Sequence, residues 1–175
     1  MSATAHQASI RPFFDEATNT VSYLVFDPAT RQGAVVDPVL DWDHRSGEAD
    51  TRSADALIEA AKREGITIAL ILETHAHADH LTAAPYIKQR CGGKIGIGEH
   101  IKDVQRIFRP VFAADDVKPE GGDFDLLFRD NERIPLGNLE IEVIHTPGHT
   151  PACVCYRIGD DVFVGDTLFM HDYGT

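Results

Sequence analysis

The sequence predicts a single α/β domain over residues 1–175, built as an internally repeated sandwich of strands. Its length suits one domain, and 43% hydrophobic with 25% charged residues is the balance of an ordinary globular protein. Two runs of strands, interleaved with helical segments, each end in a loop rich in metal-binding residue types. This repetition favours one sandwich with two similar halves over two separate domains.

Short apolar and β-branched runs bounded by turn residues predict the strands. The run at 66–72 is almost continuously apolar, so it predicts a strand covered on both faces. Gly159-Asp160 is typical of a hairpin turn between two strands. In chain order, strands are expected over residues 10–14, 21–26, 33–36, 66–72, 94–98, 124–128, 139–145, 153–158 and 162–164.

Glycine residues mark the C-terminal ends of the first two predicted helices. Ser53 is the expected N-cap of the first helix, and Gly65 is expected to end it. Segments that mix proline, glycine and acidic residues predict irregular chain instead. The expected helices are 54–64, 81–90 and a short one at 101–108, and the expected loops are 37–51 and 109–122.

Charge and composition limit the partners that we expect. Asp and Glu outnumber Lys and Arg 28 to 16, so most of the surface repels a polyanion such as nucleic acid. No stretch approaches the roughly 18 consecutive apolar residues of a membrane span, and residues 1–10 lack the pattern of a signal peptide. The three cysteines are an odd number and indicate no disulfide framework. We therefore expect a cytoplasmic protein.

Three imidazoles and one carboxylate are concentrated in the segment after the strand at 66–72. They are His75, His77, Asp79 and His80, separated by alanines too small to block their convergence. The two alternating histidines would project on one side of an extended loop, and the other two residues would begin the next helix, so all four can face one cavity. The carboxyl end of such a strand is also where α/β folds gather ligands.

Two further candidate ligands follow strands in the second half. His149 lies in Thr146-Pro147-Gly148-His149-Thr150-Pro151, where two prolines and a glycine predict a tight turn that would hold the imidazole rigidly. Asp166 follows the apolar residues 162–164 and can reach the same edge as an anionic ligand. The alternatives are a structural histidine and an ordinary turn or helix cap.

These motifs, in this order, resemble the metal motifs of the metallo-β-lactamase superfamily. The resemblance covers the chain from about Ile10 to Thr175 and implies an αββα sandwich with the metal between the sheet edges. Members of that family continue further, so this chain is expected to lack C-terminal elements and part of its substrate pocket and of any homodimer surface. Persulfide dioxygenases, including the bacterial β-lactamase-hydrolase-like subgroup, are most similar in the stretches 37–41, 72–80, 146–151 and 166–170, with glyoxalase II next.

The dioxygenase resemblance implies one Fe²⁺ held by the residues that match His75, His149 and Asp166. Two imidazoles and one carboxylate on one face are typical of non-haem iron oxygenases and leave positions open. The substrates would be O₂ and the persulfide of glutathione or of a related small thiol, with sulfite and the thiol as products. His77, Asp79 and His80 would then orient the ligands.

The glyoxalase II resemblance implies zinc chemistry with the same residues. His75, His77 and His149 would hold one Zn²⁺, Asp79 and His80 a second, and Asp166 would bridge them. A metal-bound hydroxide would attack a thioester carbonyl. A third possibility is a truncated domain that binds metal, or sulfur alone, without turnover.

Four other residues are candidates for lesser roles. Cys153 matches a cysteine that follows the Gly-His-Thr-Pro turn in persulfide dioxygenases, where it would lie near the substrate sulfur or be buried in the strand. Tyr173 would donate a hydrogen bond to substrate or simply pack its ring. His145, next to the ligand turn, is a candidate to orient a ligand. His171 stands where the resemblance predicts proline.

Overall fold

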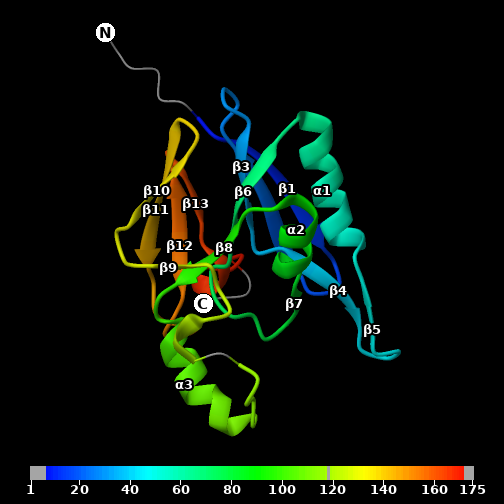
Figure 1. The fold of residues 1–175 in the computed structure, drawn as a ribbon, viewed down its shortest axis with the longest axis vertical. Coiled ribbons are helices and arrows are strands. Elements are labelled where there is room, and N and C mark those ends of the chain that lie inside the picture. Colours follow the sequence, from blue (N-terminus) through cyan, green and yellow to red (C-terminus); the bar gives the residue numbers. More distant parts are fainter. Residues whose placement is uncertain (1–6, 118, 172–175) are drawn as a thin grey trace.

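The structure, a computed structural model, describes residues 7–117 and 119–171 and contains two sheets packed face to face (Figure 1). The first sheet has the strand order β1-β2-β3-β6-β8-β9. Its strands from β3 onward are parallel, and β1 and β2 are antiparallel to their neighbours. The bounds are β1 Ser9–Asp15, β2 Thr20–Phe26, β3 Gln32–Val36, β6 Thr67–Leu72, β8 Lys94–Gly98 and β9 Leu126–Phe128.

The second sheet is antiparallel throughout, with the strand order β10-β11-β12-β13. Its strands are β10 Arg133–Leu136, β11 Leu139–His145, β12 Val154–Ile158 and β13 Asp161–Phe163. The hairpin predicted at Gly159-Asp160 joins the last two strands, with Gly159 at a φ of 61°. Every strand that the sequence predicts is present, and β10 is an additional one.

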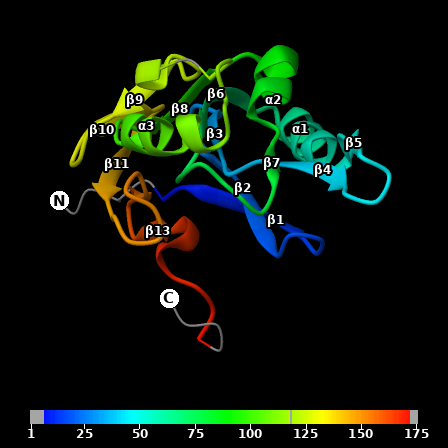
Figure 2. The same ribbon diagram turned by 90° about the horizontal axis from the view of Figure 1, so that it is seen from below.

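The core has two layers, one on each face of the first sheet. Helices α1 (Arg52–Glu64) and α2 (Ala84–Cys91) cover one face, and the second sheet covers the other. Figure 2 shows both helices together on the side of the first sheet that faces away from β11 and β13. In β6, Ile71 packs toward the helices and Leu72 toward the second sheet, so this strand is buried on both faces as predicted.

The ends of the helices differ from the predictions. The N-cap of α1 is Thr51 rather than Ser53, because the Ser53 amide and hydroxyl both donate to Asp41, at 2.8 and 2.9 Å. Gly65 ends α1 in the left-handed conformation, as predicted. The third helix, α3 (Ile101–Val111), is longer than the predicted 101–108 because it continues through Pro110, and a 3₁₀ turn, η1 (Pro119–Gly121), follows it.

The loop predicted over 37–51 is wrong, because a small third sheet forms there. Strands β4 (Val39–Asp43) and β5 (Glu48–Asp50) make a hairpin, and β7 (Leu81–Thr82) pairs with β4. The predicted helix at 81–90 therefore begins only at Ala84. The exposed acidic residues of the hairpin conceal its strand pattern in the sequence.

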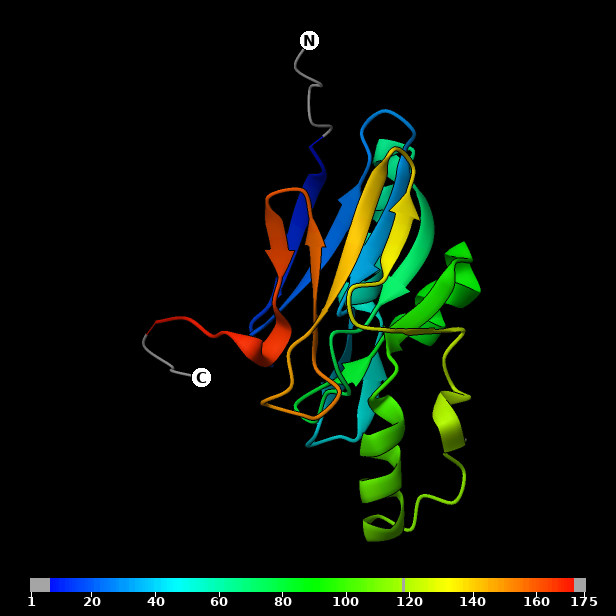
Figure 3. The same ribbon diagram turned by 90° about the vertical axis from the view of Figure 1, so that its left-hand side faces the viewer.

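The outer face of the second sheet carries paired charges. Arg133 contacts Glu140 at 2.5 Å, and Arg157 contacts Glu142. Within residues 7–117 and 119–171, no helix packs on this face (Figure 3), so the αββα arrangement is represented by its first three layers. In the same part of the chain, no helix is both long and apolar enough to cross a membrane.

Candidate metal centre

Residues from three loops meet beyond the carboxyl end of β6. His75 follows β6, His149 lies in the turn between β11 and β12, and Asp166 lies in a 3₁₀ turn, η2 (Gly165–Thr167), after β13. Asp166 Oδ2 is 3.9 Å from His75 Nε2 and 3.5 Å from His149 Nε2. One ligand atom from each residue lies within 4.8 Å of the other two. The structure therefore brings together the three residues predicted as the iron ligands.

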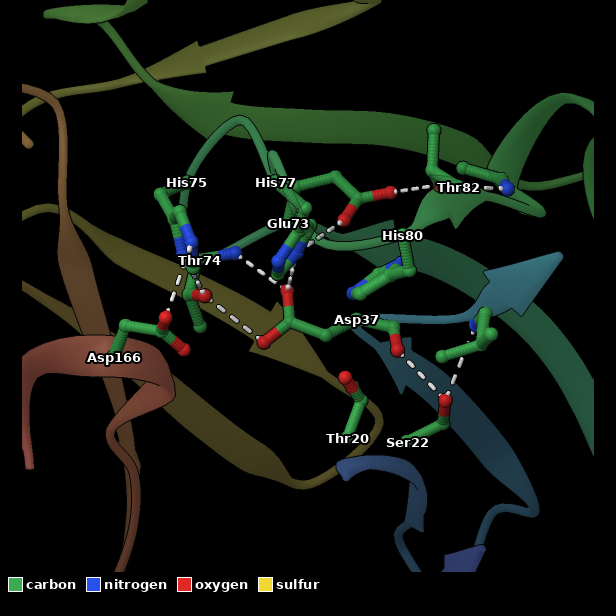
Figure 4. A network of polar contacts seen from close by, with 12 residues as sticks. Thr20, Ser22, Asp37, Glu73, Thr74, His75, His77, His80, Thr82 and Asp166 are labelled. Atoms are coloured by element: carbon green, nitrogen blue, oxygen red, sulfur yellow. Dashed lines mark hydrogen bonds and ion pairs between the residues drawn. The ribbon is translucent and has the colours of Figure 1, made fainter. Parts of the chain in front are cut away.

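A series of hydrogen bonds determines which nitrogen of His75 carries the lone pair that could bind a metal (Figure 4). The Thr74 hydroxyl donates its only hydrogen to Asp37 Oδ2 at 2.9 Å, because a carboxylate can only accept. The Thr74 hydroxyl oxygen also lies 3.0 Å from His75 Nδ1, and because its own hydrogen is already donated, it accepts a hydrogen from that nitrogen. The lone pair of the ring is therefore on Nε2, the atom that faces Asp166.

The environment of His75 Nε2 fits a metal ion. His75 is 1% exposed, and Nε2 has no hydrogen-bond partner among the described residues. Burial, together with the neighbouring His77, lowers the pKa of His75 to about 4, so the ring is neutral at pH 7. Burial also raises the pKa of Asp166, which a bound cation would oppose. A buried, unpaired nitrogen beside a second imidazole and a carboxylate is a typical donor set for a transition metal.

A second group of potential ligands lies beside the first. One ligand atom from each of His77, Asp79 and His80 lies within 4.8 Å of the others, and the rings of His77 and His80 stack at 4.1 Å. His80 Nδ1 donates to the Leu81 carbonyl at 3.0 Å, which leaves His80 Nε2 buried with no hydrogen-bond partner in the part of the chain that the structure describes. Asp79 and His80 precede β7 rather than begin a helix as predicted, because Leu81 pairs with β4.

His77 also belongs to a third group, formed with two buried carboxylates. Its Nε2 is 3.1 Å from Asp37 Oδ1 and 3.3 Å from Glu73 Oε2. Burial by itself lowers the pKa of His77, but the hydrogen bonds and charges of the two carboxylates outweigh burial and raise that pKa to about 10. Burial raises the pKa of Glu73, whereas for Asp37 the contacts with His77 and Thr74 outweigh burial and lower the pKa.

Asp37 and Glu73 are residues of the site that the sequence motifs did not predict. Each carries a usable signal, because each is an acidic residue directly after an apolar strand, and the two strands, β3 and β6, are adjacent and parallel. Acidic residues at the carboxyl ends of neighbouring parallel strands meet at the same edge of a sheet. The structure adds that both side chains are buried, at 5% and 3% exposed, which the sequence pattern does not show.

Most of the remaining candidates surround the ligand turn. Cys153 is buried, and its sulfur lies 3.2 Å from the Thr150 amide and 3.1 Å from the Thr150 hydroxyl, so it braces the turn that carries His149. His145 Nε2 contacts the Pro151 carbonyl at 2.9 Å and braces the other side of that turn. His171 is exposed, and Tyr173 lies outside the described residues.

A cavity of about 1270 Å³ opens beside the second group of ligands. Its walls are the β1–β2 turn, the β4–β5 hairpin and the loop from His77 to Leu81. The walls are strongly acidic, with the carboxylates of Asp15, Glu16, Asp41, Asp43, Glu48, Asp50 and Asp79.

Known proteins resemble this chain over nearly all of its length. It is 47% identical to a probable metallo-hydrolase of Burkholderia pseudomallei, over 95% of this chain and 60% of that protein. It is 42% identical to Glyoxylase B2 of Dictyostelium discoideum (98% and 60%) and 27% identical to the human mitochondrial persulfide dioxygenase ETHE1 (94% and 54%). The chain thus spans little more than half the length of these relatives.

The arrangement of the elements resembles a solved structure as well. The crystal structure of ETHE1 from Myxococcus xanthus superposes with a TM-score of 0.69 and 27% identity, over 93% of this chain and 59% of that one. The sequence profile of the metallo-beta-lactamase superfamily matches residues 16–175. The proteins similar to this chain include both a probable metallo-hydrolase and persulfide dioxygenases. The chain belongs to the metallo-beta-lactamase superfamily.

Proposed function

We propose that this chain is the catalytic part of an iron-dependent persulfide dioxygenase. The observation that supports this most is the separation of the ligands into groups: His75, His149 and Asp166 face one point, while His77 Nε2 faces Asp37 and Glu73 instead. Two imidazoles and one carboxylate with open positions are the donor set of non-haem Fe²⁺ oxygenases. A three-histidine zinc site would need His77 to join the first group.

The proposed substrates are glutathione persulfide, or a related small persulfide, and O₂. One persulfide, one O₂ and one water would give one thiol and one sulfite, with release of two protons from the neutral persulfide. The terminal sulfur loses four electrons, O₂ gains the same four, and the bond between the two sulfurs breaks. No further reductant is needed.

The residues of the chain have distinct proposed roles. His75, His149 and Asp166 would hold the ion, which when bound supplies the one-electron chemistry that lets O₂ react with a sulfur anion. Thr74 and Asp37 would keep the lone pair of His75 on Nε2, and Cys153 would hold the turn of His149 in place. Asp79, beside the ion, would orient the substrate, and Tyr173 stays a predicted hydrogen-bond donor to it.

The second candidate is a zinc-dependent thioester hydrolase. The observation that favours it is the second group, in which His77, Asp79 and His80 offer ligand atoms within 4.8 Å of one another. The similarity to Glyoxylase B2 points the same way. In that enzyme class, Asp166 would belong to the ligands of both zinc ions, and zinc would supply the activation of the attacking water.

One set of assays separates these candidates. The protein is purified without added metal, its metals are counted, and it is assayed for O₂ uptake with glutathione persulfide and for cleavage of a glutathione thioester. We expect one iron per chain and O₂ uptake matched by sulfite formation. Zinc with thioester cleavage would replace the proposal by the hydrolase, and metal without either activity would leave a metal-binding domain.

A further inference from the structure

His149 and Asp166 lie on two neighbouring turns at the surface. The His149 side chain is 41% exposed and that of Asp166 is 29% exposed, whereas that of His75 is 1% exposed. Packing therefore fixes His75, but the positions of the other two ligands depend on how their turns are attached. Asp166 Oδ2 lies 3.5 Å from His149 Nε2, and the two turns must keep this separation for both side chains to reach one ion.

A pair of hydroxyl groups joins these two turns. Thr146 follows β11 and begins the turn that carries His149, and Thr167 follows Asp166 in η2. The two hydroxyl oxygens are 2.9 Å apart, which is hydrogen-bond distance. Neither threonine is a candidate ligand, and the proposed reaction gives neither of them a role.

The thiol of Cys155 gives this hydrogen bond one direction. Cys155 is 4% exposed on β12, and its thiol donates to the Val164 carbonyl at 3.7 Å, because a carbonyl can only accept. The thiol has one hydrogen, so its sulfur accepts from the Thr146 hydroxyl at 3.4 Å. The hydrogen of Thr146 is then used, so the Thr167 hydroxyl donates to Thr146. Val164 precedes η2 and Thr167 ends it, so these hydrogen bonds enclose the turn that carries Asp166.

Strand β12 also holds the segment that carries His75, through separate contacts. The Val154 amide donates to the Thr74 carbonyl at 2.9 Å, and the Tyr156 hydroxyl donates to the Glu73 carbonyl at 2.8 Å. These two hydrogen bonds do not involve the threonine pair. Loss of the pair should therefore loosen the other two ligands and leave His75 in place.

We propose that Thr146 and Thr167 are positioning residues that set the separation of His149 and Asp166. Each hydroxyl would act through the ligand on its own turn and would not touch the ion. Without the hydrogen bond between them, the two turns could move independently, and the ion would be held by fewer ligands at a time. This inference rests on the three metal ligands of the proposed function.

The test replaces each threonine by valine, which has the same shape and no hydroxyl. Metal-free chains are titrated with Co²⁺ in competition with a chelator, and the visible absorption of bound Co²⁺ reports the number and arrangement of its ligands. We expect a roughly 10- to 100-fold loss of affinity and a changed spectrum in Thr146→Val and in Thr167→Val, with the wild-type spectrum restored in Thr146→Ser and Thr167→Ser. Thr67→Val, exposed at the other end of β6, is the matched control and should bind Co²⁺ as the wild type does.

Two further variants make the result specific to the pair. Thr146→Val/Thr167→Val should bind Co²⁺ about as weakly as Thr146→Val alone, because the same hydrogen bond cannot be lost twice. Cys155→Ala should lose less affinity than Thr146→Val, because the Thr146 hydroxyl could then donate to Thr167 instead. If Thr146→Val does not fold, Thr167→Val and its serine counterpart carry the test.

Three results would overturn the inference. The first is a pair of valine variants with the affinity and spectrum of the wild type, and the second is a set of serine variants that behave like the valine ones. The third is a double variant in which the two losses of affinity multiply, or a Cys155→Ala variant as weak as Thr146→Val, because either would mean that the hydroxyl pair is not what holds the two turns together.

The Co²⁺ titration and the proposed reaction fail independently. The titration uses neither iron, O₂ nor persulfide, so a chain without dioxygenase activity that loses Co²⁺ affinity in the valine variants keeps the role of the threonine pair and loses the proposed function. A chain that oxidises persulfide with unchanged Co²⁺ binding in the variants gives the opposite result.

Discussion

Gly165 lies directly against Thr74, and this contact sets the position of Asp166 relative to His75. Gly165 has a φ of 49°, and a β-carbon placed on it would lie 2.8 Å from Thr74 Cβ and closer still to the Thr74 hydroxyl. A glycine at this position lets the turn after β13 approach the end of β6. The two halves of the sandwich thereby deliver their ligands to the same point.

Gly165→Ala should weaken metal binding because the added methyl group pushes Asp166 away from His75. We expect at least a tenfold loss of affinity for Co²⁺ or Zn²⁺ in competition with a chelator, in the range seen when groups that support metal ligands are lost. Gly159→Ala is the matched control: its φ of 61° imposes similar backbone strain, but a β-carbon there meets nothing within 4 Å. Equal affinities in the two variants would mean that the contact with Thr74 does not position Asp166.

Thr74→Val should reduce metal affinity by roughly 10- to 100-fold, because valine cannot accept the hydrogen from His75 Nδ1 or donate to Asp37. Thr74→Ser keeps the hydroxyl and should restore most of the affinity. The measurement is the same chelator competition, with circular dichroism to verify folding. Identical affinities of the valine and serine variants would show that the hydroxyl does not determine which nitrogen of His75 is free.

Asp79→Ala distinguishes the proposed reaction from its alternative. If iron is held by His75, His149 and Asp166 alone, the variant should keep one iron per chain and change only in turnover. In a two-zinc hydrolase, Asp79 is a direct ligand, and its loss should lower the metal content. Loss of all metal from Asp79→Ala would contradict the assignment of the first group as the iron site.

Asp27 connects the two halves of the sandwich and makes stability depend on pH. Its buried carboxylate accepts from the Asn138 amide at 2.7 Å, the Ala29 amide at 2.9 Å and the Thr30 hydroxyl at 2.8 Å. The Asn138 hydrogen bond, followed by the others, lowers the pKa of Asp27 in the folded chain. The stabilisation is therefore present above the unfolded pKa of about 3.9 and is lost as pH falls through the lower folded value.

Asp27→Asn should accordingly lower the melting temperature at pH 7, and the difference from wild type should shrink as the pH is brought below 4. Thermal unfolding followed by circular dichroism at several pH values measures this. Asp160→Asn, an exposed position in the β12–β13 turn, is the control and should leave the melting temperature unchanged. A difference that stays constant down to low pH would mean that the charge of Asp27 is not what stabilises the fold.

The strands that build the two sheets could be predicted because their apolar runs are local. The run at 67–72 is a clear example, since both of its faces are buried and almost every residue is apolar. The β4–β5 hairpin could not be predicted in this way, because β5 is wholly exposed and the pairing of β4 with β7 joins segments about 40 residues apart. Strand pairing over such distances leaves no local pattern.

The candidate site shows the same division between local and distant information. The cluster at 75–80 indicates metal from the sequence alone, because few structural contexts require so many imidazoles. That His77 faces Asp37 and Glu73, while His75 faces Asp166, depends on side-chain directions at the ends of two neighbouring strands. Ser53 is a smaller case: a good N-cap residue by type is drawn to Asp41, so Thr51 occupies that position.

The most direct test of the account is the location of iron in crystals of the protein grown with Fe²⁺ in the absence of O₂. Anomalous diffraction at the iron absorption edge identifies the ion without reference to any assay. We predict one peak, within bonding distance of His75 Nε2, His149 and Asp166, with His77 Nε2 still against Asp37 and Glu73. A peak bound by His77, or two peaks of similar height, would contradict it.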